Sequence, residues 1–141
     1  MRFLPFVCLL SVALLFGCGK TEVPVTPTSG IVKDADGEPM ANIVVQFMPD
    51  VRKKNTGPTS QGVTGEDGRF TLHTIDGTNR EGAALGSHRV ILFDQDEQRP
   101  AQGEEVSGPI SRVPGRMQTE NGAMEVEVKA GEEVALDVPT Q

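Results

Sequence analysis

The sequence predicts an all-β fold, an antiparallel β-sandwich of about seven short strands, from three observations. Apolar and polar residues alternate with a period of two in several segments, which is typical of half-buried strands. Turn-forming pairs, among them Asp36-Gly37, Asp67-Gly68 and Ala130-Gly131, separate these segments. No window of about 11 residues after Cys18 keeps the apolar period of a helix.

The expected strands follow one another along the chain. The first two lie at about residues 30–34 and 42–48, on either side of the Asp36-Gly37 pair. Residues 90–93 are apolar on both faces, which predicts a central strand. The apolar residues that alternate along the expected inner faces are Ile43, Val45, Phe47, Phe70, Leu72, Met124, Val126, Val128, Val134, Leu136 and Val138. Because Ala130-Gly131 lies between the last two segments, we expect it to join the last two strands.

Residues 1–17 have the features of a lipoprotein signal peptide. Arg2 supplies positive charge, and an apolar run from Phe3 to Phe16 follows it. This run is shorter than the about 20 residues that a membrane-spanning helix needs. Polarity changes abruptly after Cys18, so we expect the mature chain to begin there.

The sequence Leu15-Phe16-Gly17-Cys18 resembles the lipobox of bacterial lipoproteins, an apolar residue and two generally small ones before a cysteine. The resemblance implies that Cys18 is the lipidation site, that fatty acids such as palmitate anchor the chain to the membrane of the cell envelope, and that export precedes this step. Gly19 is not Asp, which by the same resemblance favours the outer membrane, facing the periplasm or the cell surface. An ordinary signal peptide that happens to contain a cysteine is the alternative.

Residues 18–28 form the expected link between anchor and domain. Pro24 and Pro27 favour extended backbone, so this lipidated, proline-containing tether could hold the domain about 30 Å from the bilayer. The folded domain is expected at residues 29–139.

Charge and composition exclude several classes of function. The chain has 20 acidic and 13 basic residues, and Arg2 is the one charged residue of the leader, so 12 basic residues and a formal charge of −8 remain after cleavage. Such a chain repels nucleic acid, so we expect no nucleic-acid partner. The sequence has no Trp and no Tyr, which argues against a strong carbohydrate or peptide binder. A disulfide is not expected, since Cys8 leaves with the signal peptide and Cys18 is acylated.

Three motifs of the domain carry a family resemblance. The stretches GIVKDADGEPMANIVVQFMP, VTGEDGRFTL and GAALGSHRVIL resemble the transthyretin-like, carboxypeptidase-regulatory-like domain of bacterial surface lipoproteins. The positions that match the family pattern are Gly30, Gly37, Pro39, Val45, Phe47, Thr64, Asp67, Gly68, Phe70, Gly86 and Val90. His88 and Met117 stand where the family has aromatic residues. The resemblance implies a transthyretin-like β-sandwich and, because this fold serves many purposes, names no function.

No catalytic, cofactor-binding or metal-binding residues are expected, and the chain is predicted not to be an enzyme. The two histidines, His73 and His88, lack a second ligand at metal-binding spacing, and the many carboxylates fit solvated turns. Ser87 and His88 are strand neighbours that point to opposite faces, so they cannot form a nucleophile–base pair. Hydroxyisourate hydrolases and intradiol dioxygenases have related sandwiches, but the chain lacks the terminal Tyr-Arg-Gly-Ser motif of the first and the tyrosine ligands of the second.

The connection from Asp94 to Gly122 is the expected place for specific function, because loops longer than about 12 to 15 residues are uncommon without one. Its arginines, Arg99, Arg112 and Arg116, are candidate contacts with a partner, and residues 95–108 are expected to be mobile.

Together these features predict a non-enzymatic, lipid-anchored envelope protein that serves as a structural or protein-interaction module. Its partner is unknown, and nothing specifies an oligomeric state. The alternative is a ligand-binding module for carbohydrate, peptide or calcium that uses the 94–122 connection. An unrecognised hydrolase ranks last.

Overall fold

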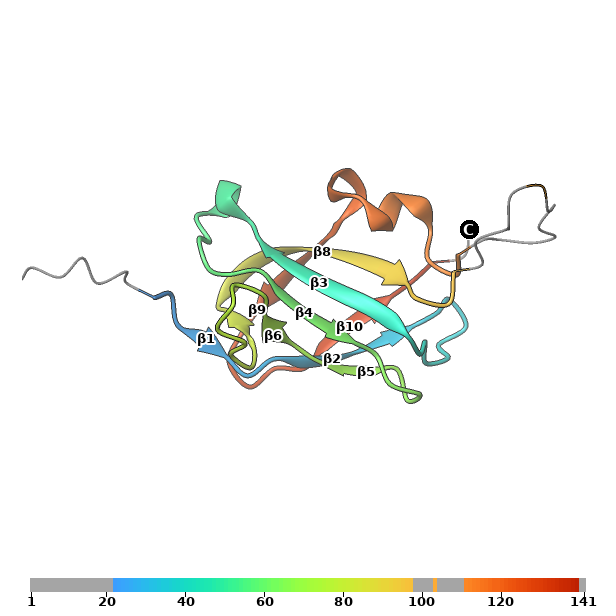
Figure 1. Ribbon diagram of the computed structural model, residues 1–141, viewed down its shortest axis with the longest axis horizontal. Helices are drawn as coiled ribbons and strands as arrows, with labels where there is room; N and C mark the ends of the chain where they lie inside the picture. Colours follow the sequence, from blue (N-terminus) through green and yellow to red (C-terminus); the bar gives the residue numbers. More distant parts are fainter. Residues whose placement is uncertain (1–21, 98–102, 104–110, 140–141) are drawn as a thin grey trace, which may run out of the picture.

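The computed structural model describes residues 22–97, residue 103 and residues 111–139. Within these ranges the chain is built of β-strands and three single-turn 3₁₀ helices, with no α-helix (Figure 1). The strands are β1 (Val25–Thr26), β2 (Ser29–Lys33), β3 (Ile43–Pro49), β4 (Ser60–Val63), β5 (Arg69–Thr71), β6 (His73–Thr74), β7 (Ala83–Ala84), β8 (Gly86–Asp94), β9 (Met124–Val128) and β10 (Val134–Asp137). The 3₁₀ helices are η1 (Val51–Lys53), η2 (Gly115–Gln118) and η3 (Glu120–Gly122). The prediction of an all-β fold is confirmed.

The larger sheet has five strands in the order β6-β4-β3-β8-β9, and every pair in it is antiparallel. β3 pairs with β8 along its whole length, from Ile43 opposite Asp94 to Pro49 opposite His88. The strand predicted to be central, at residues 90–93, belongs to β8 and lies between β3 and β9. Alternating burial along β3 follows its alternating sequence, since every second side chain of a strand points to the same face.

The smaller sheet has the order β10-β2-β5 and contains the one exception to antiparallel pairing among the described strands. β2 pairs antiparallel with β5, but β10 runs parallel to β2, with Val134 opposite Gly30 and Asp137 opposite Lys33. The predicted antiparallel pairing is therefore found in every described strand pair except β10–β2, which corrects the prediction at that pair. A parallel pair needs a long crossover between its strands, and here nearly the whole domain provides it.

Turn-forming pairs do not all join paired strands. β2 and β3, on either side of Asp36-Gly37, belong to different sheets, and so do β9 and β10, on either side of Ala130-Gly131. Gly37 and Gly131 do have positive φ angles, of 84° and 77°, as turn glycines require. The turns were recognised correctly, but each carries the chain from one sheet to the other.

The two sheets contribute side chains to one hydrophobic core. Phe47 of the five-stranded sheet and Phe70 of the three-stranded sheet meet with their ring centroids 6.2 Å apart. Leu72, which is fully buried, connects β5 in the smaller sheet to β6 in the larger one. The predicted inner-face residues Ile43, Val45, Phe47, Phe70, Leu72, Val128, Val134, Leu136 and Val138 are all buried, while Met124 and Val126 pack against the core from its partly exposed edge.

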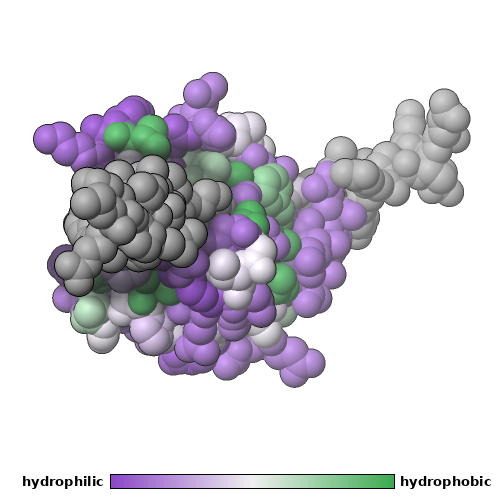
Figure 2. Space-filling view, turned by 60° about the vertical axis from the view of Figure 1, so that its left-hand side comes forward, coloured by the Kyte–Doolittle hydropathy of each residue, from purple (hydrophilic) through white to green (hydrophobic). Residues whose placement is uncertain are grey.

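The folded unit begins earlier than the sequence predicted. Residues 18–28 were expected to form a tether, but Val25–Thr26 pairs with Ala83–Ala84 as a two-stranded sheet, β1-β7, and Thr28 is buried. Figure 2 shows the end of the molecule at which β1 lies, with hydrophobic residues set among hydrophilic ones. No helix long and apolar enough to cross a bilayer occurs among residues 22–97 and 111–139.

Candidate functional site

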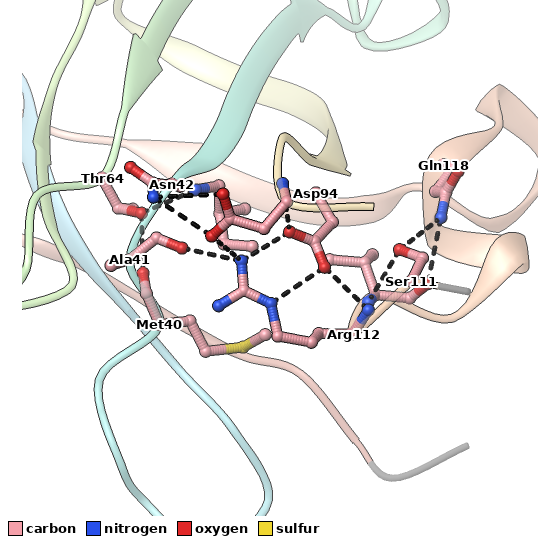
Figure 3. Close-up of polar contacts among 11 residues, drawn as sticks. Met40, Ala41, Asn42, Thr64, Asp94, Ser111, Arg112 and Gln118 are labelled. Atoms are coloured by element: carbon pink, nitrogen blue, oxygen red, sulfur yellow. Dashed lines mark hydrogen bonds and ion pairs between the residues drawn. The ribbon is translucent and has the colours of Figure 1, made fainter. Parts of the chain in front are cut away.

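An ion pair closes the base of the connection between β8 and β9. Asp94, the last residue of β8, has a side chain that is 1% exposed, and the guanidinium of Arg112 lies against it (Figure 3). The Asp94 Oδ2 atom accepts hydrogen bonds from the Arg112 backbone N–H at 2.8 Å and from its Nε at 2.9 Å. The Arg112 Nη2 atom also donates to Asp94 Oδ1. These hydrogen bonds join the first residue of the connection to Arg112, 18 residues further along the chain.

The same guanidinium has two further acceptors. Arg112 Nη2 donates to the carbonyl oxygen of Ala41 at 3.0 Å and to Asp96 Oδ2 at 3.0 Å (Figure 3). The Asn42 side-chain amide donates to the Asp96 carboxylate at 3.1 and 3.3 Å. The network therefore ties the 94–122 connection to the turn before β3.

That turn is itself fixed by a buried threonine. Thr64 Oγ1 donates to the Met40 carbonyl oxygen at 2.6 Å and accepts from the Ile43 backbone N–H at 2.9 Å. Asn42, between them, has a left-handed backbone with φ of 59°. Since asparagine tolerates this conformation better than most residues, its position in the sequence suits the turn.

Asp94 and Arg112 stabilise each other's charged forms. Burial alone raises the pKa of Asp94, but hydrogen bonds from the Arg112 side chain and backbone outweigh it, and the pKa lies below its usual value. The hydrogen bond to Asp94 raises the pKa of Arg112. Both groups are thus charged at neutral pH, and the polar edges of Asp94 and Arg112 are engaged with neighbours in the protein.

The segment after Arg112 packs onto the core. Val113 is fully buried and Met117 is 4% exposed. The Gln118 side-chain amide donates to Ser111 Oγ at 3.1 Å and to the Val113 carbonyl oxygen at 3.0 Å (Figure 3). The 3₁₀ helices of residues 111–122 therefore pack against β8, an inner strand of the five-stranded sheet.

The three predicted interaction arginines have different environments. Arg112 serves the internal ion pair, whereas Arg116 is exposed, and its side chain has no hydrogen bond or ion pair to another residue of the described part. Arg99 lies outside the described residues, as does most of the stretch 95–108 that was expected to be mobile. Cys18 also lies outside them.

His88 is fully buried in the five-stranded sheet, where its ring packs against Phe47 with centroids 5.7 Å apart. Its Nδ1 lies 2.9 Å from the carbonyl oxygen of Gly86, which can only accept, so the proton is on Nδ1. Its Nε2 is buried and has no hydrogen-bond partner among the described residues. Burial lowers the pKa of His88, so the ring is neutral at neutral pH.

Ser87 lies on the opposite face of β8 and donates to the Glu127 carboxylate at 2.7 Å. The expectation that Ser87 and His88 point apart is confirmed. His73 is half-buried at the start of β6, one strand beyond β4. Among the residues that the structure describes, no group of three or more His, Cys, Asp or Glu side chains could hold a metal ion.

A shallow depression of about 360 Å³ lies between the three-stranded sheet and the end of β4. Its lining residues are Ser29, Gly30, Val63, Arg69, Phe70, Thr71 and Glu133. Arg69 and Glu133 form an ion pair across it. None of the lining residues comes from the 94–122 connection, on which the ligand-binding alternative relies.

Sequence reasoning missed several buried polar residues. Asp94 was assigned to a solvated loop, yet it is buried, and Asp50 after β3 is likewise 2% exposed and bonded to Arg52. The available signal was position, because each aspartate stands at the end of an apolar strand: Asp94 is the last residue of β8, and Asp50 comes directly after β3. A carboxylate there is carried towards the interior with its strand and needs a cationic partner.

Comparisons of the chain with protein-family models, with curated proteins and with solved structures found no match in any of the three.

Proposed function

We propose that this protein is a non-enzymatic, lipid-anchored module of the bacterial cell envelope that serves a structural or protein-interaction role. The observation that supports a non-catalytic role is that prominent polar side chains of the domain make contacts inside the protein. Asp94 and Arg112 satisfy each other, and the His88 ring is enclosed in the core. A catalytic group has to reach substrate, whereas these groups stabilise the domain.

The anchor rests on the leader and on Cys18. The charged and apolar segments of residues 1–17 and the Leu15-Phe16-Gly17-Cys18 sequence have the features that acylation requires. Two or three acyl chains hold a protein firmly on a membrane, because each buried methylene contributes about 0.8 kcal/mol. We place the domain at the outer membrane, facing the periplasm or the cell surface.

The transthyretin-like, carboxypeptidase-regulatory-like sandwich is the fold that we propose in detail. Several residues of the family pattern have matching roles here: Phe47 and Phe70 meet in the core, and Gly68 has a positive φ of 71° in the turn before β5. A Cβ atom at Gly30 would lie 2.4 Å from the Phe70 ring, so a glycine is needed where β2 crosses that side chain. These agreements support the resemblance without depending on the number of strands.

Substitution of Cys18 tests the proposed anchor. In cells supplied with labelled palmitate, the wild type should be labelled and recovered with the membrane fraction, while Cys18→Ser should be unlabelled and soluble. Mass spectrometry of the mature terminus identifies the acyl chains. Membrane retention of unlabelled Cys18→Ser would refute the lipid anchor at this residue.

Crosslinking on intact cells tests the interaction role. Reactive probes placed at exposed positions should capture a defined envelope protein or peptidoglycan fragment with the wild type, and an exposed Arg116→Ala variant then tests whether the 94–122 connection contributes. A turnover activity of the purified protein that depends on His73 or His88 would overturn the non-enzymatic proposal.

A further inference from the structure

The start of the folded domain lies close to the proposed anchor. Arg80 Nη1 donates to the carbonyl oxygen of Val23 at 3.0 Å, and Val25 pairs with Ala84 two residues later. Four residues separate Val23 from Cys18, and the five residue-to-residue steps between them span at most about 18 Å even in a fully extended chain. The end of the domain that carries β1 is therefore held near any membrane to which Cys18 is attached.

Two loops meet at this end. The Asp50 backbone N–H donates to the carbonyl oxygen of Ser87 at 3.0 Å, and the Asn55 side-chain amide donates to the same oxygen at 3.0 Å. Gly57 packs closely on Ala84, since a Cβ atom there would lie 2.3 Å from the Ala84 methyl group and 3.5 Å from a Val23 methyl group. The loop that contains η1 and the segment before β8 thus border the point where the chain enters the fold.

Three exposed apolar residues belong to the segments that make these contacts. Val51 of η1 is 71% exposed, Leu85 before β8 is 55% exposed, and Ile75, in the loop that also holds Arg80, is 53% exposed. They account for three of the five large exposed apolar residues in the described part. The other two, Val63 and Phe93, both lie opposite Val44, at the far end of β3 from η1. We call Val51, Ile75 and Leu85 the apolar tip.

Basic residues accompany the tip. Arg52 bonds to Asp50 and Lys53 bonds to Glu125, while Lys54 has no ion-pair partner among the described residues. Apolar residues beside lysine and arginine are the combination that lets a protein surface settle into the headgroup region of a bilayer. The net negative charge of the whole chain limits purely electrostatic attraction, so contact at this end depends on the apolar residues and the anchor.

We infer that the apolar tip lies against the phospholipid surface that carries the anchor, so that the domain is docked on the bilayer with β1 towards it. In Figure 2 this side of the molecule is turned forward, and on the visible, coloured part of the surface a few hydrophobic residues lie among hydrophilic ones. The inference rests on the proposed acylation of Cys18, which supplies the proximity. It reverses the expectation that an extended tether holds the domain well away from the membrane, because β1 and Arg80 bind most of that tether to the domain.

A tryptophan reporter tests the contact. The chain has no Trp and no Tyr, so one introduced residue gives an unambiguous fluorescence signal. The acylated full-length mature protein, as Val51→Trp, is reconstituted in vesicles of phosphatidylethanolamine and phosphatidylglycerol with or without brominated acyl chains. Val63→Trp is the matched control, since Val63 is also an exposed valine but lies at the far end of β3.

At the depth of the headgroup–acyl boundary, brominated chains should strongly quench the emission of Val51→Trp and leave that of Val63→Trp nearly unchanged. Leu85→Trp should behave as Val51→Trp does, which guards against a local effect of one substitution. Circular dichroism of each variant establishes that it is folded.

Three outcomes would overturn the inference. In the first, the protein floats with the vesicles but all three reporters are equally and weakly quenched. The anchor would then be intact and the domain would not be docked. Blue-shifted emission at position 51 without bromine quenching would show that a second copy or another protein covers the tip. Failure of the acylated protein to float would refute the anchor itself, and the docking with it.

Discussion

Asp94 and Arg112 link the end of β8 to the middle of the 94–122 connection through a buried carboxylate and a guanidinium that is less than half exposed. The Asp94 side chain is 1% exposed and that of Arg112 is 43% exposed. The pair is asymmetric, because removal of the arginine leaves a charge in the interior, whereas removal of the aspartate leaves a cation that water can reach.

Arg112→Ala should therefore destabilise the domain by about 2 to 3 kcal/mol, the cost of leaving a buried charged acceptor without its donors. Arg116→Ala, four residues further along the same connection, should change the stability by less than about 0.5 kcal/mol because its side chain is exposed. Urea unfolding followed by circular dichroism measures both. Equal effects of the two substitutions would contradict a structural role for the Asp94–Arg112 pair.

His88 should make the stability depend on pH below neutrality. Burial lowers its pKa beneath the usual value of about 6.5, so between pH 7 and pH 5 the unfolded chain takes up a proton that the folded chain does not. The free energy of unfolding should consequently fall as the pH is lowered through this range. In His88→Leu, which cannot titrate, that fall should be smaller.

The comparison needs unfolding curves of both proteins at pH 5 and pH 7, with His73→Leu as a control for the loss of a half-buried histidine. A fall of the same size in the wild type and in His88→Leu would assign the pH dependence to other groups.

Gly82→Ala should detach β1 from β7. Gly82 has a φ of 109°, and a Cβ atom there would lie 1.8 Å from the carbonyl oxygen of Thr26, so β1 has to move. Amide hydrogen exchange at residues 25–26 should become markedly faster, and proteases should cut this segment more readily.

Gly77→Ala is the matched control, because Gly77 also has a positive φ, of 90°, but a Cβ atom there meets nothing within 4 Å. It should cost about 1 kcal/mol through backbone strain and leave exchange in β1 unchanged. If the amides of residues 25–26 exchange at the same rate in the two variants, the close approach of Gly82 to β1 does not hold the strand in place.

The strands and their inner faces could be read from the sequence because alternation is a local property. Ile43, Val45 and Phe47 are two residues apart, so whichever strand pairs with β3, all three side chains point to one side. Glycines that need a positive φ marked the turns in the same local way.

The choice of strand partners was decided by the tertiary structure. β10 follows β9 closely, yet it pairs with β2 in the other sheet and in parallel, since burying Val134 and Leu136 in the shared core takes precedence over a hairpin. The tertiary structure also decided two other features: Val25–Thr26 pairs with β7, and Asp94 is buried beside Arg112. Each depends on contacts between residues far apart in the chain, and the sequence pattern around a single residue does not specify which distant segment will cover it.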